Sequence, residues 1–154
     1  MRRPKLETTP AARAAGGKAP PASLPPLKNI LAVAAGGAIG ATLRYSFIVA
    51  FPVVPGSFPL TIFTENIAGA FLLGLVLTLV LEHWRWRWDI RPFLTTGILG
   101  SFTTFSNLSL DIVALGRDGW LLIALGYSAA SVAVGLLFAF LGIWVARRLA
   151  RGRA

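Results

Sequence analysis

The sequence predicts an all-α membrane protein with four transmembrane helices. Hydrophobic residues make up 55% of the 154 positions, charged residues make up 14%, and the mean hydropathy is +0.69. A soluble domain carries about 25% charged residues, and a soluble core could not hide this much apolar surface. The apolar residues also gather in runs that are each near the roughly 20 residues a bilayer span requires.

The order of these runs predicts one membrane domain over residues 27–150, with no soluble domain beside it. The predicted spans cover about residues 27–51, 60–81, 92–115 and 120–146. The Pro/Ala-rich basic segment 1–26 lacks the apolar stretch of a secretory signal and is expected to be a disordered tail. Residues 147–154 form a second basic tail. His83 and the Trp/Arg alternation at 84–88 are interpreted as a solvated, interfacial loop.

The net charge of +9 belongs to the flanks of the spans, which argues against nucleic-acid binding. Thirteen of the 15 Lys and Arg lie in residues 1–28, 85–91 or 147–153, and four spans place these segments on one side. Arg117 stands alone on the other side. This Lys/Arg asymmetry predicts that both chain ends lie in the cytoplasm. The chain contains no Cys, so disulfides and thiolate metal sites are excluded.

The third run is apolar yet rich in hydrogen-bonding groups. Phe93–Leu110 has no charged residue, but hydroxyls and an amide recur through it and concentrate in Gly100–Asn107. A lipid-facing helix gains nothing from such groups, which are tolerated at membrane depth where they are buried in protein or line a watered cavity. The sequence therefore predicts passage of a small polar species. Gly100 and Ser101 would let the helix break at mid-span, and carbonyls freed there can coordinate a cation such as sodium.

Other polar residues interrupt the first two spans. Arg44 must snorkel, pair with a carboxylate or face a watered vestibule. Asn66 is interpreted either as a helix–helix clamp or as a substrate ligand. Glu65 points about 100° away from Asn66 around the helix, so we expect it to face a dimer seam or the vestibule of Arg44. Asp111 is interpreted as a marker of the membrane interface.

The available chemistry indicates a transporter of ions rather than an enzyme. The sequence offers no Ser-His-Asp or Cys-His set, no carboxylate pair on one helix face and no phosphate-binding loop. It offers hydrogen-bond donors from Asn, Ser and Thr, which can replace the water shell of a small anion. Phenyl rings add the positive edge of their quadrupole.

Three motifs in order resemble the CrcB/Fluc family of fluoride channels. Gly36–Tyr45 looks like the signature of the family's first span, Thr64–Gly74 resembles its second-span pattern around an Asn, and Gly97–Ser106 is similar to its broken third span. The resemblance covers the four-span region. It implies small subunits that pair antiparallel into a dual-topology dimer, with two pores that export fluoride passively across the bacterial plasma membrane and relieve its toxicity.

The resemblance also implies roles for individual residues. Asn66 and Phe105 match residues that line the pore, and Arg44 matches the Arg at its vestibule. Backbone carbonyls at Gly100 and Thr103 match those that hold a structural sodium ion at the dimer centre. The remaining matches contribute polar contacts along the permeation path: Thr104, Ser106, Tyr127 and Ser131.

The chain departs from the family pattern at several of these positions. Glu65 replaces the usual Val before the pore Asn, and Ser101 replaces a second Gly at the break. Leu108 replaces a second Phe and has no ring edge to offer an anion, while Asn107 replaces a small hydroxyl residue. With the charge asymmetry, Leu108 favours a heterodimer with an oppositely inserted paralogue as the alternative to an antiparallel homodimer.

Two other function classes remain as alternatives to the channel. A small proton-coupled multidrug exporter has a similar size, but such exporters use a carboxylate in the first span, where this chain has Arg44. Glu65 would be the candidate proton carrier. A purely structural membrane subunit would require neither the mid-span break nor Asn66.

Overall fold

The computed structural model describes residues 25–83 and 90–151, and within them the chain is helical apart from short connections. The helices, in chain order, are α1 (Leu27–Ala50), α2 (Leu60–Thr78), the π-helical segments η2 (Leu79–His83) and η3 (Pro92–Leu99), α3 (Gly100–Phe102), α4 (Phe105–Arg117) and α5 (Leu121–Arg151). The predicted tail, except for residues 25 and 26, and the Trp/Arg loop at 84–88 lie outside the described residues.

The described residues contain four helical stretches long and apolar enough to cross a membrane, which confirms the four predicted spans. They cover Leu27–Ala50, Leu60–Glu82, Pro92–Arg117 and Leu121–Arg151. The last helix continues past the predicted end at Ala146. In this extension Arg147 donates to the Glu82 carboxylate at the end of the second stretch, with Nη2 and Oε1 2.8 Å apart. Basic side chains in the last turn also favour the helix C-terminus.

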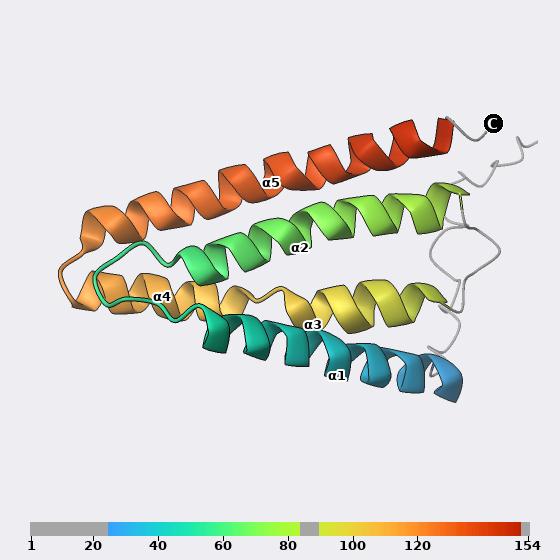
Figure 1. Ribbon diagram of the computed structural model, residues 1–154, viewed down its shortest axis with the longest axis horizontal. Helices are drawn as coiled ribbons and strands as arrows, with labels where there is room; N and C mark the ends of the chain where they lie inside the picture. Colours follow the sequence, from blue (N-terminus) through green and yellow to red (C-terminus); the bar gives the residue numbers. More distant parts are fainter. Residues whose placement is uncertain (1–24, 84–89, 152–154) are drawn as a thin grey trace, which may run out of the picture.

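The four stretches lie side by side as an elongated bundle (Figure 1). The start of α1, the end of α2, the start of η3 and the end of α5 lie at one end of the bundle, and the connections 51–59 and 118–120 lie at the other. The second stretch packs mainly on α5, while α1 packs mainly on η3 and α3. Because the chain direction alternates, α2 and α5 run parallel.

Glycines bring the backbones of these pairs together. A Cβ on Gly36 would collide with the Phe93 carbonyl oxygen. Between α2 and α5, a Cβ on Gly142 would collide with the Phe71 carbonyl, and one on Gly74 with the Ala139 carbonyl. Small residues allow such approaches where bundle helices cannot rely on a hydrophobic driving force in lipid. Gly36, Gly74 and Gly142 therefore set how closely these helix pairs approach.

The outer face of the bundle is apolar. Leu122 is 86% exposed and Phe140 is 67% exposed, and both belong to the long helix α5. Side chains of this kind would be unfavourable in water and suit the hydrocarbon of a bilayer or the surface of a second subunit.

We expect Gly142→Ala to destabilise the bundle, because the new methyl group meets backbone that cannot move aside. Overpacking of this kind costs roughly 1–3 kcal/mol. Gly126 lies on the same helix, and a Cβ there would have no neighbouring atom within 4 Å, so Gly126→Ala is the matched control. Thermal unfolding in detergent measures both. Equal melting temperatures for the two variants would contradict the packing.

Candidate functional site

The third membrane stretch leaves helical conformation at Thr103 and Thr104. Thr103 has φ −74° and ψ 149°, Thr104 has φ −144° and ψ 121°, and α4 begins at the next residue. The extended segment is visible between α3 and α4 in Figure 1. Thr104 then caps α4, because its Oγ1 accepts from the Asn107 N–H at 3.2 Å. A side-chain cap of this kind supplies one of the partners that the helix start lacks.

Asn66 on α2 holds the extended segment with both ends of its carboxamide. Its Oδ1 accepts from the Thr104 N–H at 2.9 Å, and its Nδ2 donates to the Thr104 carbonyl at 3.0 Å. This pairing fixes which end of the amide is oxygen. Of the two interpretations of Asn66, the helix–helix clamp is thus observed. The Thr104 carbonyl takes one of the two hydrogens that a carboxamide nitrogen carries.

The resemblance implies a sodium site at the Gly100 and Thr103 carbonyls. The Asn66 clamp and the Thr104 cap each divert a backbone donor from one of them. In a continuous α-helix, the Gly100 carbonyl would accept from the Thr104 N–H, and the Thr103 carbonyl from the Asn107 N–H. Here the Thr104 N–H donates to Asn66, and the Asn107 N–H donates to Thr104 Oγ1. Both carbonyls thus lose the partner that a regular helix would give them.

Phe105 and Leu108 point in different directions. Phe105, the first residue of α4, is 80% exposed on the subunit surface. Leu108 packs instead against the buried cluster of Leu115, Ala124 and Tyr127. Of the two positions at which the resembled family has Phe, this chain keeps only Phe105. Its ring lies on the outer surface of this subunit.

Tyr127 and Asp111 form a separate polar pair between α5 and α4. Tyr127 is fully buried, its ring meets that of Phe58 edge-on with centroids 5.2 Å apart, and its hydroxyl donates to Asp111 Oδ2 at 3.3 Å. The interpretation of Asp111 as an interface marker misses this contact. The sequence signal for this contact was a Tyr in the span that follows the span of Asp111, because a buried hydroxyl normally has a hydrogen-bond partner.

Glu65 is buried inside the subunit, so the expectation that it faces a dimer seam is wrong. Its exposed fraction is 0%, and neither carboxylate oxygen has a hydrogen-bond partner. It interacts electrostatically with Arg44 on α1, and the vestibule role of Arg44 stays a prediction. Ser131 Oγ on α5 also lacks a partner.

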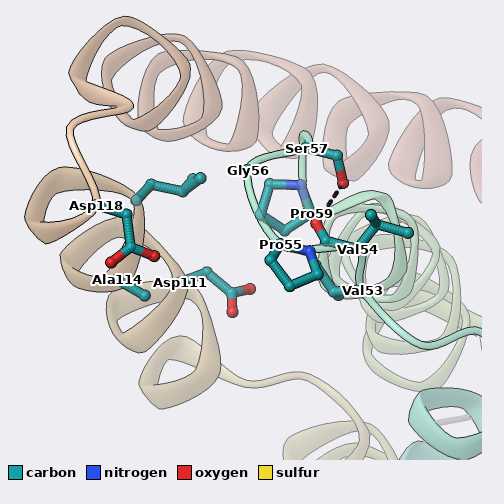
Figure 2. A pocket seen from close by; sticks show the side chains of 10 residues that line it. Val53, Val54, Pro55, Gly56, Ser57, Pro59, Asp111, Ala114 and Asp118 are labelled. Atoms are coloured by element: carbon teal, nitrogen blue, oxygen red, sulfur yellow. Dashed lines mark hydrogen bonds between the residues drawn. The ribbon is translucent and has the colours of Figure 1, made fainter.

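A cavity of about 260 Å³ lies at the end of the bundle where residues 51–59 cross over. Figure 2 shows Asp111 of α4 and Asp118, the residue that follows α4, on one side and Pro55 and Pro59 of the connection 51–59 on the other. Two carboxylates beside apolar walls disfavour an anion. This cavity is therefore suited to water or cations.

The structure thus brings some of the predicted residues together and leaves others apart. Asn66, Thr104 and Ser106 form one connected group, since Thr104 Oγ1 and Ser106 Oγ are 3.0 Å apart. Phe105 follows directly in the chain. Tyr127 is bonded to Asp111 and belongs to the other pair. The pore and sodium roles stay predictions.

We expect Asn66→Leu to lower stability by about 1–3 kcal/mol, because both Thr104 backbone groups lose a partner in a dry setting. Asn107→Leu is the matched control, since its backbone N–H, and not its side chain, makes the bond to Thr104. Thermal unfolding of the two purified variants measures the difference. An Asn66→Leu protein as stable as the control would show that the two Asn66–Thr104 hydrogen bonds do not stabilise the protein.

Comparison with known proteins identifies the family of the chain. A family model described as CrcB-like protein, Camphor Resistance (CrcB), matches residues 31–143. A fluoride-specific ion channel FluC 2 of Nocardia farcinica is 42% identical over 129 residues, 82% of this chain and 92% of that protein. A fluoride-specific ion channel FluC of Agrobacterium fabrum is 42% identical over 122 residues, 79% of this chain and 98% of that protein. The chain belongs to the CrcB-like family.

Proposed function

We propose that this chain is a subunit of a fluoride-specific ion channel, which lets fluoride leave the cell passively through the plasma membrane. The observation that carries the proposal is the extended segment at Thr103 and Thr104, held by Asn66 in the middle of the Pro92–Arg117 stretch. The relatives named fluoride-specific ion channels support the choice of ion. A channel of this kind performs no covalent chemistry and is not an enzyme.

The group around the extended segment has the chemistry that a small anion needs. Fluoride must exchange its water shell for protein groups of positive polarity, and the second Asn66 amide hydrogen, the Ser106 hydroxyl and the Phe105 ring edge are groups of this kind. Arg44 supplies positive charge at a vestibule of the same path. On α5, Tyr127 and Ser131 lie one helical turn apart and continue the polar path on the other side of α2.

A structural sodium ion fits the interruption. The Gly100 and Thr103 carbonyls have lost their helical donors to the Asn66 clamp and to the Thr104 cap. Hard cations such as sodium are held by oxygen ligands, and carbonyls at a helix break are a known source of them. The ion would supply fixed positive charge at the depth of the break.

We expect the purified protein to melt at a higher temperature in sodium chloride than in choline chloride of equal ionic strength. A ligand at 100 times its Kd stabilises by about 2.7 kcal/mol. Asn66→Leu releases the Thr104 N–H to the Gly100 carbonyl, so this variant should lose most of the sodium effect. Identical melting of the parent protein in both salts would refute the sodium site.

A second subunit in antiparallel orientation would complete the path. Phe105 is 80% exposed on one subunit, and a ring edge can contribute to a dry pore only if something covers it. The partner is a second copy of this chain or an oppositely inserted paralogue. The second copy is the default, and the Lys/Arg asymmetry, which opposes insertion of one sequence in both directions, is the argument for the paralogue.

We expect Phe105→Ala to reduce fluoride efflux from liposomes, while melting temperature and oligomeric state stay close to those of the parent. A ring-edge contact of about 0.5–1.5 kcal/mol corresponds to a change of up to about tenfold. Phe140→Ala, at another exposed Phe, is the matched control. Efflux from liposomes that contain this chain alone would also show that it pairs with itself.

Two results would contradict parts of this proposal. Unchanged flux in Phe105→Ala would remove this ring from the path. Flux of organic cations driven by a proton gradient, without fluoride conduction at equal pH on both sides, would favour the multidrug-exporter alternative.

A further inference from the structure

Glu65 and Ser131 leave three polar atoms buried without a partner. These are both carboxylate oxygens of Glu65 and the hydroxyl oxygen of Ser131, and among the described residues no other buried side-chain nitrogen or oxygen is left in this condition. Buried polar groups are normally satisfied, so each exception calls for a ligand, a water or a change of protonation. Neither group belongs to the Asn66 clamp or to the Tyr127–Asp111 pair.

The register of α2 and α5 places the two groups at the same depth. The helices run parallel (Figure 1), and a Cβ on Gly135 would lie 3.8 Å from Ile67 Cδ1. Glu65 precedes Ile67 by two residues and Ser131 precedes Gly135 by four, which along parallel helices amounts to a difference of about 3 Å in rise. Two residues also correspond to a rotation of about 200° around α2, so Glu65 points away from the face of α2 that meets α5 at Ile67. Glu65 also interacts electrostatically with Tyr127, one turn from Ser131.

The charged and titratable groups that face Glu65 come from three helices. Arg44 on α1 and Tyr127 on α5 interact with it, and Asp111 on α4 is bound to Tyr127. The segment Pro92–Phe102 contributes no titratable side chain. Arg44 acts on Glu65 without a hydrogen bond, because neither Glu65 oxygen has a hydrogen-bond partner among the described residues.

A carboxylate in this position would be costly. An ionised group buried without a hydrogen bond is strongly disfavoured, and the neutral acid is the form that such a site accommodates. The neutral acid differs from the carboxylate in one further respect, since it carries an O–H donor. Glu65 in this form carries no charge, although it lies directly beside Asn66 and interacts electrostatically with Arg44 and Tyr127, three residues of the path proposed for fluoride.

We propose that the protonation of Glu65 controls fluoride flux, because loss of its proton places an unpaired negative charge in the dry interior, directly beside Asn66, where it repels the permeating ion. Fluoride flux through this chain therefore falls as pH rises. The inference rests on the proposed fluoride channel and adds its regulation by a proton.

The experiment measures fluoride efflux from liposomes at equal pH on both sides, in a series from about pH 5 to pH 9, where Lys and Arg keep their charge. Protein-free liposomes measure the leak of neutral hydrogen fluoride at each pH. We expect flux through the parent protein to fall by about tenfold or more across the series, since a unit charge near the path acts through a low dielectric. Glu65→Gln keeps a neutral donor and should conduct at every pH without this dependence.

Three further variants separate the proposal from other causes. Asp111→Asn removes the other in-span carboxyl and should keep the pH dependence, as should Glu82→Gln at the exposed pair with Arg147. Ser131→Ala should keep the pH dependence as well, because the Ser131 hydroxyl does not titrate in this range. A folded parent protein that conducts equally at all pH values would overturn the proposal but leave the channel intact. A folded Glu65→Gln protein without flux would overturn it as well, whereas absence of fluoride flux from the parent at any pH would refute the channel itself and with it this site.

Discussion

The two hydrogen bonds between Asn66 and the Thr104 backbone are the interaction on which the rest of the site depends. A backbone segment cannot leave helical conformation inside a bilayer unless its N–H and C=O find partners in the protein. The Asn66 carboxamide supplies one acceptor and one donor, at 2.9 and 3.0 Å, and so satisfies both backbone groups of Thr104 from a neighbouring helix. The same bonds explain why Gly100 loses its helical donor and why α4 starts afresh at Phe105.

The fold was predictable from the sequence because it follows from the length and the order of the apolar runs. Apolar runs of bilayer length, bounded by charge and proline, leave few arrangements other than four spans. The end of α5 was not predictable in the same way. Arg147 looks like the start of a tail, yet it lies within the helix and pairs with Glu82 in a different span. A contact between residues so far apart in the chain is not visible as a local pattern.

The site was predictable only as far as local patterns reach. Asn66 and the polar stretch at Gly100–Asn107 are conspicuous in apolar surroundings, but their pairing joins residues 38 positions apart. Glu65 shows the same limit. Helical geometry correctly separates it from the face of Asn66, but the neighbour on its own face depends on which helix packs there. That face proves to be the interior, so a residue expected at a subunit seam is fully buried.

Burial changes what Glu65 can do. On an exposed seam its carboxylate would be solvated or paired, and its charge would matter little to an ion inside the subunit. In a dry interior, without a hydrogen bond, the charge of the Glu65 carboxylate acts strongly on a nearby ion, and the neutral acid is the form that the structure accommodates. The chain therefore places a titratable acid directly before Asn66 on α2. Asn66 satisfies the Thr104 backbone, whereas Glu65 has no hydrogen-bond partner. A residue that only filled space there would be an apolar one, because Val or Leu would pack without this cost.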